Sequence, residues 1–282
     1  MTTTKTKRRT TKRASEPATD GAAAPSPAPE AVGGRSLEGR VALVTGASRG
    51  IGAAIARTLG AEGASVVVNY VRSRGPAEDV AAEVERLGGK ATVIQADVSD
   101  ENQCTTLAND TVTAFGKFDF LVNNAGVLED QWFRKMDRLS FDRIISTNLS
   151  SVFSMMKAVL PGMESRGYGR IVNMASFVGQ TGNITQANYA AAKAGMVGLT
   201  KVVALETAAK GITVNAVCPG FIGTEMVTGL SDKIQGMLLE KIPMGRFGDP
   251  EDVAKGVLYL VRDADYVTGA SLNINGGLMT AY

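Results

Sequence analysis

From Leu37 onward, short apolar runs alternate with longer stretches whose apolar residues recur at helical spacing. The apolar runs predict buried strands at 41–46, 65–70, 91–96, 118–124, 169–176, 212–217 and 271–275. The stretches between them predict helices near 51–61, 76–87, 101–115, 138–164, 188–210 and 251–262. Strands this apolar are typical of a parallel sheet that helices cover on both faces. The pattern therefore predicts a single α/β domain over residues 37–282, with a doubly wound, seven-stranded parallel sheet.

Residues 1–36 differ in composition from the rest of the chain. They are rich in Thr, Ala, Pro, Lys and Arg and contain no aromatic residue. Seven Lys or Arg residues against three acidic ones give this segment a net charge of +4, which leaves −2 on residues 37–282. Such a segment buries too little apolar surface to offset the entropy lost on ordering. We therefore expect a disordered basic tail.

The tail has three interpretations. The first is a solvated extension or an artefact of the assigned start site. The second is weak electrostatic tethering of the KTKRRTTKR segment to a polyanion or an anionic surface, without recognition of a specific nucleic acid. The third is an organellar transit peptide. It is disfavoured because residues 2–13 contain no apolar side chain to form an amphipathic helix face.

The chain contains no histidine, which excludes Ser-His-Asp triads and histidine-ligated metal sites. Its two cysteines, Cys104 and Cys218, lack CxxC spacing, so neither a structural zinc site nor a disulfide framework is predicted. No run approaches the ~20 apolar residues that span a bilayer, and the amino terminus lacks the apolar region of a signal peptide. We therefore expect a cytoplasmic protein without metal, whose acid–base chemistry uses Tyr, Lys, Asp, Glu or Cys.

A glycine-rich turn, TGASRGIG at 45–52, follows the first predicted strand and precedes the first predicted helix. Glycines permit close approach of the backbone, and a helix amino terminus favours an anionic pyrophosphate. An ordinary tight turn also recruits glycine, but this position between strand and helix indicates a Rossmann-type dinucleotide site. The predicted cofactor-binding residues of the turn are Gly46, Ser48, Arg49, Gly50, Ile51 and Gly52.

The end of the second predicted strand indicates which dinucleotide is bound. NAD sites usually present Asp or Glu there to the ribose hydroxyls, about 20 residues after the glycine turn. This chain has Asn69 and Tyr70, followed by Arg72 and Arg74. Without a carboxylate to repel a 2′-phosphate, and with Arg49 and Arg72 or Arg74 as donors, the site favours NADPH over NADH. The alternative is that these arginines are solvated loop residues.

Ser176, Tyr189 and Lys193 form a candidate catalytic group. Tyr189 and Lys193 lie four residues apart on one predicted helix and share a face. Ser176 ends the fifth predicted strand, where open α/β sheets bind ligands. A free tyrosine titrates near pH ~10, and a nearby ammonium is expected to lower that pKa by favouring the phenolate. A tyrosine and a lysine at this spacing are also a common surface pair, but the glycine turn, the strand end and the absence of histidine favour a catalytic role.

These motifs, with NNAG at 123–126, Asn148 and CPG at 218–220, resemble the short-chain dehydrogenase/reductase family over essentially the whole chain after the tail. The resemblance implies a catalytic tetrad of Asn148, Ser176, Tyr189 and Lys193. In it, Tyr189 is the proton donor to a substrate carbonyl oxygen that Ser176 also hydrogen-bonds, and Lys193 also holds the nicotinamide ribose. It implies that Asn148 supports a water chain to the lysine; the alternative is a polar residue satisfied within a buried helix. The further cofactor positions that it implies are Asp97, Val98, Asn124, Ala125, Gly126, Pro219, Gly220, Ile222 and Thr224. Gly and Asn at such loop positions also have a purely structural interpretation.

Substrate specificity is expected in the loop 177–186 and in the segment 224–247, which we expect to form a mobile lid. The segments 133–136, 166–173 and 179–195 resemble acetoacetyl-CoA reductases of polyhydroxybutyrate synthesis. Parts of the chain also resemble 3-oxoacyl-(acyl-carrier-protein) reductases. The candidate substrate contacts are Ser176, Phe177, Gln180, Gln186, Tyr189 and Phe221. The alternative for the loop residues is no contact with the substrate.

The resemblance implies NADPH-dependent reduction of a β-ketoacyl thioester. Acetoacetyl-CoA is the first expected substrate, and a 3-oxoacyl-(acyl-carrier-protein) of fatty acid synthesis is the alternative. A basic rim that suits either carrier is expected from Arg134, Lys135, Arg138, Arg166 and Arg170. A third interpretation is a non-catalytic NADP-binding protein tethered through its tail, which the intact tetrad disfavours.

Two predicted helices, 138–164 and 188–210, carry apolar residues on more faces than one sheet contact covers. Such faces indicate packing between subunits. The family resemblance implies a homotetramer, with Asn275, Gly276 and Gly277 near an interface.

Overall fold

The structure is a computed structural model that describes residues 1–2 and 36–280. Residues 36–280 group into one compact unit. The predicted tail over residues 1–36 lies almost wholly outside the described residues, so its disorder and its tethering stay predictions.

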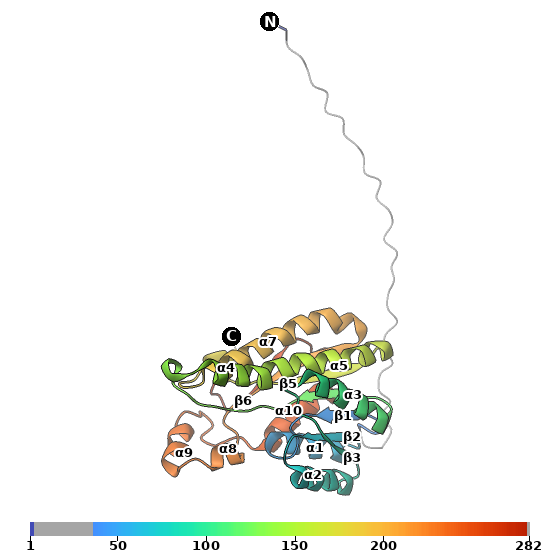
Figure 1. The fold of residues 1–282 in the computed structure, drawn as a ribbon, viewed down its shortest axis with the longest axis horizontal. Coiled ribbons are helices and arrows are strands. Elements are labelled where there is room, and N and C mark those ends of the chain that lie inside the picture. The colour runs from blue at the N-terminus through green and yellow to red at the C-terminus, as the bar shows by residue number, and fades with distance from the viewer. Residues whose placement is uncertain (3–35, 281–282) are drawn as a thin grey trace. The chain divides into compact units, whose positions relative to one another are not determined.

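Seven parallel strands form one sheet in this unit (Figure 1). Their order is β3-β2-β1-β4-β5-β6-β7, and each adjacent pair is parallel. The strands are β1 Val41–Val44, β2 Ser65–Tyr70, β3 Lys90–Gln95, β4 Phe120–Asn123, β5 Gly169–Met174, β6 Ile212–Pro219 and β7 Ser271–Ile274. The order reverses between β1 and β4, where open α/β sheets bind ligands. The predicted doubly wound α/β fold is confirmed.

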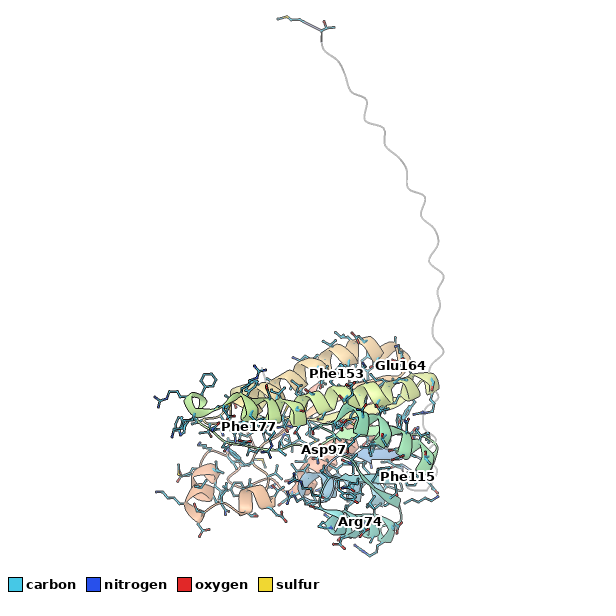
Figure 2. The ribbon with its side chains drawn as sticks, viewed as in Figure 1. Arg74, Asp97, Phe115, Phe153, Glu164 and Phe177 are labelled. Atoms are coloured by element: carbon cyan, nitrogen blue, oxygen red, sulfur yellow. The ribbon has the colours of Figure 1, made fainter. Side chains whose placement is uncertain are left out.

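Helices cover both faces of the sheet, with α5 and α7 on one side and α1 and α2 on the other (Figure 1). The longer helices are α1 Gly50–Ala61, α2 Arg74–Arg86, α3 Glu101–Phe115, α4 Arg138–Ile145, α5 Ser151–Arg166, α7 Ala187–Thr207 and α10 Pro250–Arg262. Alternate side chains of β1 point to opposite faces of the sheet and pack into two different hydrophobic cores. Ala42 and Val44 join the core of α1, α2 and α10, whereas Val41 and Leu43 join the core of α3, α5 and α7. Side chains fill the space between sheet and helices (Figure 2).

The helix predicted over 138–164 is divided in the structure. A π-helical turn, η2 Ser146–Ser150, separates α4 from α5, and the buried Asn148 lies at its centre. Single π-helical turns frequently mark functional sites. The prediction of one continuous helix over 138–164 is therefore wrong, because the π-helical turn that contains Asn148 interrupts it.

The segment 224–247 contains two short helices, α8 Glu225–Thr228 and α9 Asp232–Leu239. None of the residues of α9 is buried, and its Ile234 and Met237 are exposed. Elements with few buried apolar contacts are the first to open in folded proteins. Movement of this segment as a lid stays a prediction. The other short helices are η1 Phe133–Lys135, α6 Val178–Thr181 and η3 Ala208–Lys210.

Candidate active site

The glycine-rich turn between β1 and α1 has a shape that excludes side chains. Gly46 and Gly50 have φ angles of 61° and 57°, which L side chains rarely adopt. A Cβ built on Gly52 would lie 2.5 Å from the carbonyl oxygen of Gly46. A Cβ on Gly46 would lie 2.9 Å from Cα of Ala125. The turn therefore leaves its backbone open to close approach, and no larger residue fits at these positions.

The turn leads into the amino terminus of α1. The N-cap residue Arg49 makes no side-chain capping hydrogen bond, so its side chain leaves the first N–H groups of this 12-residue helix open to an anion. Ser48 and Ile51 are half-buried in the same turn. A glycine cradle that opens into an uncapped helix end fits the pyrophosphate of a dinucleotide.

Asn69, a predicted cofactor residue, ties the turn to the sheet. Its Oδ1 accepts a hydrogen bond from the Gly46 N–H at 3.1 Å. Its Nδ2 donates to the carbonyl oxygens of Ile94 and Ala96 at 3.2 and 3.1 Å. The residue is 1% exposed. Its side chain is thus committed to backbone partners, and Asn69 acts as a positioning residue for the turn.

Thr45 and Asn124 join the ends of β1 and β4. The Thr45 hydroxyl accepts hydrogen bonds from the N–H groups of Asn124 and Ala125, both at 3.0 Å. The Asn124 Nδ2 donates to the carbonyl oxygens of Thr45 and Gly46, also at 3.0 Å. These bonds fix the two strands at the point where their order reverses. Asn124 and Ala125 therefore shape the floor of the predicted cofactor site.

Three arginines near the predicted 2′-phosphate position differ in their partners. Arg74 pairs with Glu78 at 2.8 Å, and Arg49 pairs with Glu225 at 3.2 Å. Arg72 is exposed and forms no ion pair within the described part of the chain. Arg72 is therefore the better placed of the two arginines that the sequence left as alternatives.

Other predicted cofactor residues lie at the ends of neighbouring strands. Tyr70 ends β2 and is buried. Beyond β3, the Asp97 carboxylate accepts hydrogen bonds from the N–H and the hydroxyl of Ser99 at 2.9 and 2.7 Å. The Val98 side chain belongs to the core that also contains residues of α3, so only its backbone is open to a ligand.

The loop after β6 packs between β7 and the glycine turn. Pro219 is the last residue of β6, and a Cβ on Gly220 would lie 2.7 Å from Cα of Asn275. Ile222 is buried, and the Thr224 methyl group would lie 3.3 Å from a Cβ on Gly50. The predicted nicotinamide loop and the predicted phosphate turn therefore meet in space.

The predicted catalytic side chains come together at the carboxyl end of the sheet. Tyr189 lies in the first turn of α7, and its ring centroid is 5.5 Å from the Lys193 Nζ. Lys193 is buried and donates a hydrogen bond to the Met174 carbonyl oxygen at the end of β5. The Ser176 Oγ accepts the Val178 N–H at 3.2 Å, which leaves its own proton free to donate. The fold thus assembles Ser176, Tyr189 and Lys193.

The titration of this group differs from the prediction. Burial raises the pKa of the Tyr189 phenol to about 12, although a hydrogen bond with Ser176 acts in the opposite direction. Burial also lowers the pKa of the Lys193 ammonium to about 8. In the protein alone the Tyr189 pKa is therefore raised, where the sequence analysis expected Lys193 to lower it, because the loss of solvation is the largest effect on the phenol.

Asn148 lies beside the lysine but makes different contacts from those expected. Its Oδ1 accepts the Val127 N–H and its Nδ2 donates to the Val127 carbonyl oxygen, both at 2.8 Å. A Cβ on Gly126 would lie 3.2 Å from this Oδ1 and 3.8 Å from the Lys193 Nζ. The side chain thus fastens the loop after β4 to the π-helical turn. These contacts agree with the structural alternative for Asn148.

The predicted apolar walls of the substrate site meet each other. The Phe177 and Phe221 rings pack edge to face with centroids 5.1 Å apart. Gln180 donates through its Nε2 to the Cys218 Sγ at 3.5 Å, and its buried Oε1 has no partner in the described part of the chain. Gln180 therefore has an acceptor to offer, which keeps it a substrate candidate.

Gln186 is less available to a substrate. Its Nε2 donates to Asp130 at 2.9 Å, and its Oε1 accepts from Asn183 at 3.1 Å. Nearby, the Gln131 N–H donates to the Thr185 carbonyl oxygen at 2.8 Å. These bonds join the loop after β4 to the loop before α7. The sequence analysis missed Asp130 and Gln131, because no local pattern indicates which distant loop a polar residue will contact.

The five basic residues proposed as one rim are divided between two edges of the sheet. Arg170 is near the start of β5, is 7% exposed and pairs with Asp265. Arg166 donates to the Phe118 carbonyl oxygen near that edge. Arg134, Lys135 and Arg138 instead follow β4, so they lie toward the edge that carries Tyr189. The prediction of a single basic rim is wrong.

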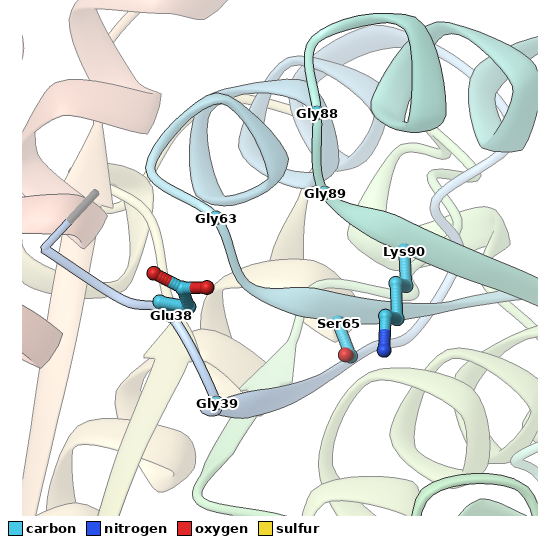
Figure 3. A pocket seen from close by; sticks show the side chains of 7 residues that line it. All are labelled: Glu38, Gly39, Gly63, Ser65, Gly88, Gly89 and Lys90. Carbon is cyan, nitrogen blue, oxygen red and sulfur yellow. The ribbon is translucent and has the colours of Figure 1, made fainter. Parts of the chain in front are cut away.

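One hollow lies outside this site. A hollow of about 550 Å³ is lined by Glu38, Ser65, Lys90 and four glycines, at the opposite ends of β1, β2 and β3 (Figure 3). Among residues 1–2 and 36–280, no cluster of His, Cys, Asp or Glu suits a metal ion. No helix in those residues is long and apolar enough to cross a membrane.

Comparison with known proteins agrees with this geometry. A family model described as Enoyl-(Acyl carrier protein) reductase matches residues 46–279. The chain is 46% identical over 238 residues to the 3-oxoacyl-(acyl-carrier-protein) reductase FabG of Staphylococcus epidermidis, which covers 84% of this chain and 98% of that protein. It is 45% identical over 246 residues to the 3-oxoacyl-(acyl-carrier-protein) reductase of a Synechocystis species, with 86% and 98% covered. Nodulation protein G of Azospirillum brasilense is 45% identical over 240 residues, with 85% and 98% covered. The chain belongs to the short-chain dehydrogenase/reductase family.

Proposed function

We propose that the protein reduces a 3-oxoacyl thioester to a 3-hydroxyacyl thioester with NADPH. The single observation that carries this proposal is the assembly of Ser176, Tyr189 and Lys193 beside the uncapped amino terminus of α1. Two relatives named as 3-oxoacyl-(acyl-carrier-protein) reductases support an acyl-carrier-protein thioester as the substrate. Acetoacetyl-CoA is the second candidate, on the resemblance of the loop that contains Gln180.

The cofactor would lie over the glycine turn, with its pyrophosphate at the amino terminus of α1 and its 2′-phosphate near Arg72. When bound, it supplies a hydride to the substrate carbonyl carbon. The absence of a carboxylate at Asn69 supports NADPH over NADH, because an acidic side chain there would repel the phosphate.

Side chains of the protein donate the proton and stabilise the charge that develops on the substrate. The Ser176 hydroxyl donates a hydrogen bond to the substrate carbonyl oxygen and stabilises the negative charge that develops there. Tyr189 then gives its phenolic proton to the same oxygen. A pKa of about 12 keeps this phenol protonated at neutral pH, which suits reduction. Lys193 places a positive charge beside the ring and would hold the nicotinamide ribose.

Oxidation of NADPH by acetoacetyl-acyl-carrier protein, acetoacetyl-CoA and a 3-oxooctanoyl thioester tests this function directly. We expect turnover with NADPH to exceed turnover with NADH. Replacing Tyr189→Phe should lower kcat by at least ~10²-fold, because the proton donor is lost. NADPH binding, measured by fluorescence of the reduced nicotinamide, should persist. Absence of turnover on every 3-oxoacyl thioester would favour the non-catalytic NADP-binding alternative.

Three further proposals concern the whole protein. The exposed apolar side chains of α5 and α7 support a homotetramer. The two free, buried cysteines, Cys104 and Cys218, support a reducing, cytoplasmic location. The basic segment within residues 1–36 supports weak tethering to a polyanion or an anionic surface.

A further inference from the structure

An exposed aromatic and basic surface lies between β4 and α4. We name it the Trp132 surface and define it by Trp132, Phe133, Arg134 and Lys135. The side chains of Trp132 and Phe133 are 61% and 77% exposed, and no residue of the 3-10 helix η1 is buried. Large aromatic side chains exposed side by side are unusual on a free surface and mark contact with a partner.

The Trp132 surface adjoins the candidate active site through backbone contacts. The residue before it, Gln131, donates its N–H to Thr185. Asp130 accepts from Gln186, three residues before Tyr189. These two hydrogen bonds therefore link the segment before the Trp132 surface to the loop that precedes the proton donor Tyr189. A partner seated on it is within reach of the substrate loop.

Around this surface, four charged side chains form two ion pairs, the carboxylates of Asp130 and Asp137 accept hydrogen bonds from neutral groups, and two cations have neither kind of contact. Arg138 pairs with Asp142 at 2.6 Å, and Arg143 pairs with Glu129 at 3.3 Å. The Asp137 carboxylate is occupied with the N–H of Ser140 at the start of α4. Arg134 and Lys135, by contrast, form no ion pair with any residue of the described chain.

Trp132, Arg134 and Lys135 line a hollow of about 450 Å³. Aromatic residues and arginine are the side chains most enriched where protein partners bind. Two unpaired cations at the rim of an apolar surface favour a partner that offers carboxylates beside apolar side chains.

We propose that the Trp132 surface docks an acidic acyl-carrier protein and so delivers its thioester to Tyr189. The inference rests on the proposed function, because it assigns the protein that carries the substrate. Trp132 and Phe133 contact the apolar side chains of the carrier. Arg134 and Lys135 pair with its carboxylates, which sets the orientation in which the thioester arm enters beside the loop 177–186.

Charge reversal tests the docking by steady-state kinetics. The double variant Arg134→Glu with Lys135→Glu should raise KM for acetoacetyl-acyl-carrier protein by about tenfold or more, because attraction becomes repulsion. The kcat value should stay within about twofold, as should KM for NADPH and for acetoacetyl-N-acetylcysteamine, a short thioester without a carrier. The matched control is Arg86→Glu with Lys90→Glu, which makes the same charge change near the opposite edge of the sheet. It should leave every constant unchanged.

Other occupants of the Trp132 surface would give different results in these experiments. An equal rise in KM for acetoacetyl-CoA would show that the hollow binds the nucleotide end of CoA, and would overturn protein docking. An unchanged KM for the carrier-bound substrate would also overturn it. A change in the oligomeric state of the double variant, measured by light scattering, would assign the surface to a contact between copies of this chain.

Binding can be measured without turnover, since Trp132 is the only tryptophan in the chain. Adding acyl-carrier protein without an acyl group should change the tryptophan fluorescence of the full-length protein, and high salt should weaken the response. A flat titration would reject the proposal. If instead the fluorescence responds while no thioester is reduced, the docking stands and the proposed function fails.

Discussion

At the residue scale, burial changes the pKa values of two side chains of the site, Tyr189 and Lys193. The same loss of solvation raises the pKa of Tyr189 to about 12 and lowers that of Lys193 to about 8. Both shifts favour the uncharged forms of the side chains. The phenol therefore keeps the proton that reduction requires, while the ammonium is held closer to its titration point than a surface lysine.

The pH dependence of the reaction follows from these directions. Reduction needs the phenol and the ammonium, so the rate should be flat at neutral pH and fall as pH rises through about 8, when Lys193 loses its proton. The reverse oxidation needs the phenolate and should rise with pH over the same range. Rates of both directions measured from pH 6 to 10 at saturating cofactor check this. A reduction rate that increases above pH 8 would contradict it.

At the element scale, the π-helical turn joins two parts of the site. Asn148 reaches from this turn to both backbone groups of Val127, and so fastens the loop that begins at β4. The next residues of that loop contact the loop before α7. One buried carboxamide thus holds the loop whose other residues, Asn124 and Asp130, contact the glycine turn and the substrate loop.

Replacing Asn148→Ala should remove two buried hydrogen bonds. The free energy of unfolding, measured in urea, should fall by about 1–3 kcal/mol, because the Val127 backbone groups lose their partners. KM for NADPH should rise as the loop loosens. If Asn148→Ala instead lowers kcat alone and leaves stability unchanged, the relay interpretation of Asn148 is the better one. Asn102→Ala, at an exposed position of α3, serves as the control.

At the scale of the whole molecule, two long helices present apolar side chains to solvent. Phe153 on α5 is 46% exposed, and Val202 and Leu205 on α7 are 53% and 83% exposed. Burying such side chains between subunits removes apolar surface from water, at roughly 25 cal/mol per Å². These faces are distinct in sequence from the Trp132 surface, so one molecule has separate candidates for self-assembly and for carrier docking.

Introducing charge on α7 tests the assembly. Val202→Glu combined with Leu205→Glu should convert a tetramer to smaller species, because two carboxylates would be buried without partners. Light scattering after size-exclusion chromatography measures the mass. Lys90→Glu, near the opposite edge of the sheet, should leave the mass unchanged. A wild-type protein that elutes as a monomer would reject the homotetramer.

The strands could be predicted closely from the sequence, whereas several side-chain roles could not. Runs such as VALV and SVVVNY are apolar on both faces, which specifies a buried parallel strand from local residues alone. The spacing of Tyr189 and Lys193 is likewise local. Asn69 and Gln186 were predicted as ligand contacts, yet in the structure their hydrogen bonds go to backbone and side chains far away in the sequence. Local periodicity carries no information about such partners.

The carboxamides that brace the cofactor turn have a consequence for the robustness of the site. Asn69, Asn124 and Asn148 hold their backbone partners with a group that neither gains nor loses a proton in the ordinary pH range. The framework thus keeps its shape while acidity changes around it. In a chain without histidine, the response to pH is left to the reacting side chains and not to the scaffold that positions them.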